Sequence, residues 1–318
     1  MTDSFPGDVF DALQQQCGVV SRAQVLSSGM TRKQIEGRLR GGRWQRLYPG
    51  VYATFSGDPG RASILWAAVL RVGDKAVLSH YTAAELAGLI GTPSATIHVT
   101  VPSGQGVSPI PGVTLHYSRR VAQARHPVRT PPQTRVEETV LDLASVSASL
   151  DEALGWMFRA CGSRKTTPDR LAAALALRDR VRWRTELGAA LALGAQGVHS
   201  LLEFRYVNRV ERPHGLPAAA RQYQVTRAGQ RQYQDVTYQT YGVVVELDGR
   251  AAHPVELRWR DVRRDNASAA EGQVTLRYGW PDVTQRPCLV ATEVGAVLSG
   301  RGWDGRLRRC SPACLIPP

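Results

Sequence analysis

The stretch VVVELDG, from Val243 to Gly249, constrains the fold of this chain more than any other. Successive side chains of a strand point to opposite faces, so the branched apolar residues at alternate positions form one buried face. The opposite face carries two acids, Glu246 and Asp248, directly before a glycine. The pattern predicts a strand that is buried on one side and presents carboxylates on the other.

A third acid, Asp235, lies in the strand-like run that precedes this stretch. A hairpin with Thr240-Tyr241 at its tip places Asp235 opposite Glu246, and a longer tip places it opposite Asp248. Two carboxylates about 4 Å apart repel by about 4 kcal/mol at an effective dielectric constant of about 20. A proton, an arginine or a divalent cation can offset that penalty, and carboxylate oxygens suit Mg²⁺.

The order of predicted elements around these acids is helix, strand, strand, strand, helix, strand, helix. Glu203 falls inside the first helix, which follows an Ala/Gly-rich stretch near 187–197 that we interpret as a link. With Asp235 and Glu246 as its ligands, a magnesium ion would activate water and stabilise the transition state of phosphodiester hydrolysis. Glu203 would complete the acidic cluster.

This order and placement resemble the PD-(D/E)XK nuclease superfamily. More narrowly, residues 198–300 resemble the endonuclease-like domains related to very-short-patch-repair endonucleases, of the "domain of unknown function 559" type. The resemblance implies catalytic roles for five residues: Glu203, Asp235, Glu246, Asp248 and His253. The resemblance also covers Arg264, in the helix predicted after this strand, and we expect Arg264 to contact DNA. The chain has no lysine after Lys165, so the lysine of the superfamily motif is absent and His253 would serve as base.

The N-terminal segment predicts two helices, a basic third helix and a hairpin around Pro49-Gly50. Ser21 and Thr31 are suitable N-caps for the second and third helices, and Ile35 and Leu39 would face the core. This is the order of a winged helix-turn-helix, whose basic helix enters the major groove while the wing touches phosphates. The expected DNA-contacting residues are Arg32, Lys33, Gln34, Arg38, Arg40, Arg43 and Arg46.

The order GVVSRAQ, GMTRKQI and GRWQRLYPGVY resembles the N-terminal winged helix of AbiEi-type antitoxins of abortive-infection systems, over roughly Val9 to Ala53. SHYTAAELAGL, which begins at Ser79, also matches such chains. The resemblance implies DNA binding, often at the promoter of the protein's own operon. It leaves open a second function: a repressor of a toxin–antitoxin operon, partnered by a toxin, whose nuclease fold is inactive.

The charge of the chain is consistent with a polyanionic partner. Its 40 Lys and Arg residues exceed its 27 Asp and Glu residues, which gives a net charge of +13. The start of the chain has no secretory signal and no later run is apolar enough for a membrane span. We therefore expect a cytoplasmic, DNA-binding protein with no membrane association.

The expected architecture is a multi-domain α/β chain of the α+β kind. Its predicted parts are a winged helix-turn-helix over residues 1–55, a middle α/β region over 56–185, and an α-β-β-β-α-β-α endonuclease-like domain over 198–318. In the middle region, His80 has no catalytic partner placed by the sequence and is expected to be a buried structural histidine. Cys310 and Cys314 lie four residues apart, but the sequence offers no second ligand pair at a zinc spacing, so ordinary thiols are expected.

Overall fold

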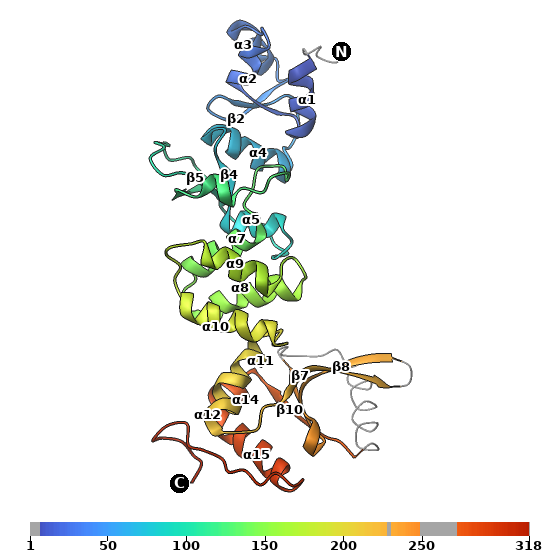
Figure 1. Cartoon of the computed structure of the whole chain (residues 1–318). Helices are drawn as coiled ribbons and strands as arrows, with labels where there is room; N and C mark the ends of the chain where they lie inside the picture. Colours follow the sequence, from blue (N-terminus) through green and yellow to red (C-terminus); the bar gives the residue numbers. More distant parts are fainter. Residues whose placement is uncertain (1–6, 228–229, 249–271, 318) are drawn as a thin grey trace. The chain divides into compact units, whose positions relative to one another are not determined.

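The computed structural model describes residues 7–227, 230–248 and 272–317 (Figure 1). The described strands form three small sheets among many helices, so the chain has the predicted mixed α/β class. It divides into two compact units, residues 1–148 with 177–182, and residues 149–176 with 183–318. This division crosses the predicted middle range 56–185, and the three finer ranges stay predictions.

The N-terminal part of the first unit has the predicted order of three helices followed by two short strands. An additional short strand, β1, precedes the second helix and gives a sheet of order β1-β3-β2. The elements are α1 (Gly7–Gln15), β1 (Val19–Ser21), α2 (Arg22–Ser27), α3 (Arg32–Arg40), β2 (Gln45–Tyr48) and β3 (Val51–Ala53).

Both predicted N-caps of this part are confirmed. Ser21 accepts the backbone N–H of Gln24, and Thr31 accepts that of Gln34, while each glutamine side chain bonds back to its cap residue. This reciprocal capping satisfies backbone donors that a helix start leaves unpaired. Ile35 is buried and Leu39 partly buried against the same core, as their spacing predicts.

The rest of the first unit contains a second sheet of order β4-β5-β6. A two-residue strand, β4, lies between the first two helices of this part and pairs with β5. The elements are α4 (Arg61–Val72), β4 (Val77–Leu78), α5 (His80–Leu86), β5 (Ile97–Pro102), β6 (Val113–Ser118), α6 (Val121–Ala124) and α7 (Val136–Val146).

The second unit begins with three helices, α8 (Leu150–Gly162), α9 (Pro168–Ala176) and α10 (Arg184–Ala195). The link expected near 187–197 is therefore wrong, because most of that stretch is helix α10. Alanine is the strongest helix former, and the leucines of this stretch recur at a spacing that lets Leu187 and Leu191 be buried.

The remaining elements of the second unit follow the predicted order where the structure describes them. Strand order is β10-β9-β8-β7, with β9 parallel to β10 and the other pairs antiparallel. The predicted helix between β9 and β10 lies outside the described residues. The elements are α11 (Leu201–Arg205), the π-helical turn η1 (Tyr206–Glu211), α12 (Arg212–His214), β7 (Ala220–Arg227), β8 (Gln230–Tyr238), the 3-10 turn η2 (Gln239–Tyr241), β9 (Val243–Asp248), β10 (Val274–Gly279), α14 (Trp280–Gln285) and α15 (Pro287–Ser299).

Helices α11, α12, α14 and α15 lie on one face of this sheet (Figure 1). The core between them joins Tyr206 and Val210 of η1 to Val243 and Val245 of β9 and to Leu298 of α15. The predicted apolar face of β9 is thus confirmed as the buried face. Its acids point to the other side of the sheet.

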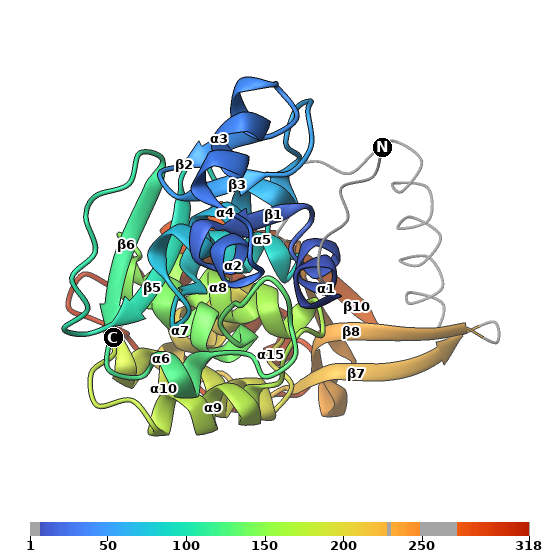
Figure 2. The ribbon, with the colours of Figure 1, turned by 90° about the horizontal axis from the view of Figure 1, so that it is seen from above.

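Strands β7 and β8 extend beyond the sheet as a two-stranded arm (Figures 1 and 2). Strand β9 pairs only with Val236 to Tyr238 of β8, whereas β7 pairs with β8 as far as Arg227. Tyr223 and Tyr233 on the arm are exposed.

Candidate acidic site

Glu203 is held on the first turn of α11 by the chain that precedes it. Ser200 caps the helix by accepting the Glu203 N–H (3.1 Å), and Glu203 Oε2 accepts the His199 N–H (3.0 Å). The residue is only 4% exposed. A buried carboxylate is costly unless something compensates it, which makes this side chain a candidate functional group.

Glu203 and Asp235 share one partner, the side chain of Gln222 on β7. The Gln222 amide donates to Asp235 Oδ1 (3.2 Å) and to Glu203 Oε1 (3.4 Å). Burial raises the pKa of Glu203, and the nearby Asp235 charge raises it further, although hydrogen bonds from His199, Ser200 and Gln222 act in the opposite direction. The structure therefore brings together two of the predicted acids, from a helix and from a strand.

The pairing of β8 and β9 decides between the two registers considered from the sequence. Val236 pairs with Val245 and Tyr238 with Val243, so the next position in this register sets Asp235 opposite Glu246. The Leu247 N–H donates to Asp235 Oδ2 (2.8 Å), which holds Asp235 against β9. Directly opposite side chains of a sheet lie about 4.5–5.5 Å apart at Cβ.

Gln222 has a backbone conformation that is unusual for a residue with a side chain. Its φ angle is 45°, and it lies opposite Asp235 between the paired residues Arg221–Val236 and Tyr223–Gln234. A positive φ in a non-glycine residue costs about 1–3 kcal/mol and recurs at functional sites. Sequence reasoning missed Gln222, because nothing in RQYQVTR distinguishes it from the neighbouring glutamine.

The next residue back along β7, Arg221, anchors the strand beside Gln222. Its guanidinium forms a buried ion pair with Glu211 of η1 and lies over the Tyr206 ring. Because this pair ties β7 to the helical side of the sheet, it fixes where Gln222 meets Asp235.

The last two predicted acids lie on β9. Glu246 and Asp248 are partly exposed and stand beside Arg277 and Gly279 of β10 in the parallel register. Glu203, Asp235 and Glu246 offer only oxygen donors, the ligand set that Mg²⁺ prefers, but among the described residues these three carboxylates do not converge on one point as the ligands of a bound ion would. His253 and Arg264 lie outside the described residues.

The predicted DNA-contacting side chains differ in exposure. Arg32, Lys33, Arg40, Arg43 and Arg46 are exposed on α3 and the β2–β3 hairpin.

Two other predicted contacts have structural roles. The Gln34 side-chain oxygen accepts the Thr31 N–H (2.7 Å), so it serves the helix cap. Arg38 is half-buried with its guanidinium 5.3 Å from the centre of the Trp44 ring, and burial and Arg43 lower its pKa. Periodicity alone marks an exposed face but does not reveal a partner contributed by a neighbouring strand.

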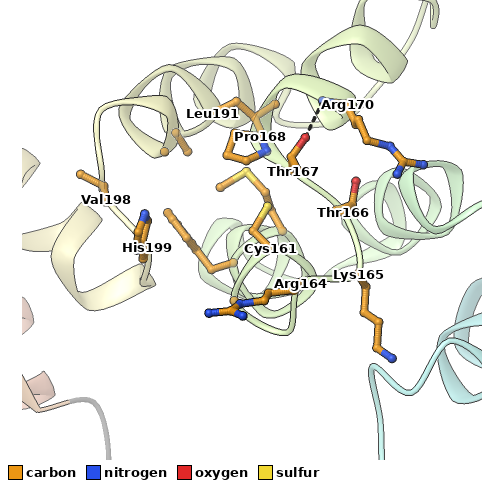
Figure 3. A pocket seen from close by; sticks show the side chains of 15 residues that line it. Cys161, Arg164, Lys165, Thr166, Thr167, Pro168, Arg170, Leu191, Val198 and His199 are labelled. Atoms are coloured by element: carbon orange, nitrogen blue, oxygen red, sulfur yellow. Dashed lines mark hydrogen bonds between the residues drawn. The ribbon is translucent and has the colours of Figure 1, made fainter. Parts of the chain in front are cut away.

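A cavity of about 660 Å³ lies among α8, α9 and α10 (Figure 3). Its apolar walls include Cys161, Pro168 and Leu191, while the basic residue Arg164 lies at its edge and Lys165 extends away from it. The cavity reaches His199, whose backbone also bonds to Glu203. The cavity thus adjoins the segment that leads into Glu203 within the same unit.

The first unit contains a separate pocket lined by histidines and acids. The burial expected for His80 is confirmed, and its Nδ1 lies 2.9 Å from Ser79 Oγ while its ring stacks on His116 at 3.6 Å. Burial, followed by the neighbouring His116, His98 and Arg178, lowers the pKa of His80 to about 3, and burial together with His98 lowers the pKa of His116 to about 4. The acids of this pocket, Glu138 and Asp142, are paired with Arg178. The rings are therefore neutral at neutral pH.

The structure also gathers a cluster that the sequence analysis did not anticipate. His214, Cys288, Cys310 and Cys314 place their ligand atoms within 4.8 Å of one another. The second ligand pair that the sequence lacked is His214 and Cys288, which come from α12 and α15. A spacing search cannot find it, because these two residues are far apart in the chain.

No protein family and no curated protein matches the chain. Among solved structures, a weak likeness is to the RV2827C protein from Mycobacterium tuberculosis, with 15% identity and a TM-score of 0.40. That likeness covers 60% of this chain and 78% of the mycobacterial protein. In the part of the chain that the structure describes, none of the helices has the length and apolar character that crossing a bilayer requires.

Proposed function

We propose that this protein binds DNA and hydrolyses phosphodiester bonds with Mg²⁺, through an endonuclease-like site in its second unit. The observation that carries this proposal is the junction of Glu203, Gln222 and Asp235, with Glu246 opposite Asp235 on the next strand. A buried acid with a raised pKa beside a second acid is a costly arrangement that a bound cation would relieve.

In this proposal Asp235 and Glu246 ligate the metal, which supplies Lewis acidity and an activated water. Glu203 would complete the acidic site beside Asp235, and Asp248 extends the acidic face of β9. His253 would orient or deprotonate the water, in place of the lysine that the sequence lacks. The sheet order β10-β9-β8-β7 with helices on one face suits a PD-(D/E)XK-like core.

The proposed DNA contacts lie in both units. The exposed cations of α3 and the β2–β3 hairpin suit a winged helix-turn-helix, with α3 in the major groove. In the second unit, the arm of β7 and β8 carries the exposed side chains Arg231 and Tyr233. A two-stranded ribbon fits the major groove as well as a helix does.

A second function is favoured by one specific observation. Both carboxylate oxygens of Asp235 already accept hydrogen bonds, from Leu247 N–H and from Gln222. An acid whose two oxygens both accept hydrogen bonds from the protein can have a purely structural role. The corresponding proposal is an AbiEi-like repressor that binds its own promoter beside a toxin gene and retains an inactive nuclease fold.

Nicking of supercoiled plasmid by the full chain distinguishes the two functions. We expect Mg²⁺- or Mn²⁺-dependent nicking that is lost in Asp235→Asn and in Glu246→Gln, while both variants still bind DNA. Asp304→Asn is the matched control, because Asp304 is an exposed acid of the same unit. Nicking that persists in both site variants, or that is absent from the wild-type chain at every metal concentration, contradicts the nuclease proposal.

A further inference from the structure

Four potential metal ligands meet where the C-terminal tail returns to the helices of the second unit. His214 ends α12, Cys288 lies in the first turn of α15, and Cys310 and Cys314 belong to the tail that follows α15. His214 is fully buried and Cys314 is 7% exposed. These residues are separate from the acidic site described above.

The distances among the sulfur atoms suit a shared metal better than a disulfide. Cys288 Sγ lies 3.6 Å from both Cys310 Sγ and Cys314 Sγ. A disulfide needs about 2.05 Å between its sulfur atoms. Two thiolates on one tetrahedral zinc ion, each about 2.3 Å from the metal, lie about 3.8 Å apart.

His214 is oriented as a metal ligand would be. Its Nδ1 lies 2.8 Å from the carbonyl oxygen of Val210, so Nδ1 carries the proton and donates it to that carbonyl. The other ring nitrogen, Nε2, is buried and finds no hydrogen-bond partner among the described residues. A backbone carbonyl on one ring nitrogen is the usual means of directing the other toward a metal. A buried, unpaired nitrogen, on a ring that lies beside three cysteines, is otherwise costly.

We propose that His214, Cys288, Cys310 and Cys314 bind one zinc ion. Three thiolates and an imidazole are soft or borderline ligands, and a tetrahedral set of this kind selects zinc over magnesium. Four protein ligands leave no open coordination position, so the ion is structural and activates no water. The site would carry a net charge of −1, in a tail that contains Arg306, Arg308 and Arg309.

The ion would fasten the tail to the helical side of the second unit. The Arg308 N–H already donates to the His214 carbonyl (2.9 Å), and Ile316 is buried in the core. Gly215 has a φ of 69°, and an added Cβ there would lie 3.1 Å from the Arg308 side chain. The tail therefore passes close to α12. A bound zinc ion would hold the tail in this position, because the segments that carry the ligands are short.

Metal content of the full chain tests the proposal directly. After purification under reducing conditions without chelator, we expect one zinc ion per chain, released when the thiols are modified. Cys310→Ser and His214→Ala should lose the bound zinc. Cys17→Ser and Cys161→Ser are the matched controls and should retain it, because neither thiol belongs to the cluster.

Cobalt provides a second readout if a cluster variant fails to fold. Wild-type chain stripped of metal and reloaded with Co²⁺ should show the intense visible bands of a tetrahedral thiolate site, and Zn²⁺ should displace the Co²⁺. A chain that contains no zinc and takes up no Co²⁺ overturns the proposal, as does a disulfide between any two of the three cysteines in freshly purified protein. The acidic-site variants Asp235→Asn and Glu246→Gln should not change either readout.

Discussion

The acidic cluster and the His/Cys cluster lie in the same compact unit and differ in every physical respect that decides their role. The first offers hard oxygen atoms from α11, β8 and β9, and two of its acids are partly exposed. The second offers three sulfur atoms and one imidazole from α12, α15 and the tail, with His214 and Cys314 buried, Cys288 partly buried and Cys310 exposed.

The two proposals therefore assign these groups of side chains different roles. The acidic cluster keeps a buried carboxylate and a residue with positive φ, features that cost stability and are typical of a working site. The His/Cys cluster has the closed ligand set of a structural ion, whose binding free energy adds to folding. The following predictions separate the two, in order of decreasing effect.

The largest effect is expected on phosphodiester cleavage. Asp235→Asn should slow metal-dependent nicking by a factor on the order of a thousand, roughly 4 kcal/mol in activation free energy. The reason is that the variant removes the charge of a proposed metal ligand at almost unchanged side-chain volume, although the asparagine oxygen can accept only one of the two hydrogen bonds that Asp235 accepts. Single-turnover nicking kinetics measure it, with Cys310→Ser as the comparison. If loss of the thiol slowed nicking as much in folded protein, the two clusters would not be functionally separate.

Removal of metal from the His/Cys cluster should destabilise the second unit by about 3 kcal/mol, the effect of a ligand present at a few hundred times its dissociation constant. Native-state hydrogen exchange reports this at the amides of β8 and α15. Amides of β5 in the first unit are the internal control and should keep their protection. Equal loss in both units would contradict a local structural role.

Glu203→Gln should change the free energy of unfolding in the opposite direction and stabilise the second unit at pH 8 by about 1 kcal/mol. The raised pKa of Glu203 means that its ionised form is disfavoured in the folded state, so stability is lost as pH rises through the folded pKa. Glutamine removes this loss, and the gain should vanish at a pH below the ordinary glutamate pKa. Hydrogen exchange across that pH range measures it, and a gain independent of pH would rule out ionisation as the cause.

The smallest effect concerns the first unit and tests whether DNA binding is independent of both clusters. The double variant Arg43→Ala/Arg46→Ala should reduce the slope of log affinity against log salt by about 1.8, since each phosphate contact contributes about 0.9. Fluorescence anisotropy with duplex DNA measures the slope. Lys75→Ala, an exposed cation of the same unit, should leave it unchanged. An unchanged slope in the double variant would show that the hairpin does not contact DNA phosphates.

Local sequence patterns predict some features of this protein and miss others. The apolar face of β9, both helix caps and the burial of Ile35 follow from short-range periodicity and are confirmed. Most of the stretch expected to be a link is helix α10, because the helical preference of its alanines outweighs that of its glycines for irregular structure. The DNA contacts expected of Gln34 and Arg38 stay predictions, and the structure adds local contacts of these side chains with a helix cap and with the Trp44 ring.

Residues that are neighbours in the chain were enough to predict the mixed α/β class, the described elements around β9 and the face on which Glu246 lies. Tertiary contacts were needed to set the register that points Asp235 toward Glu246, to join Gln222 to Glu203, and to bring His214 to three cysteines. The physical reason is that strand register and helix packing are set by many weak contacts acting together. Side chains distant in sequence therefore become neighbours without leaving any local pattern.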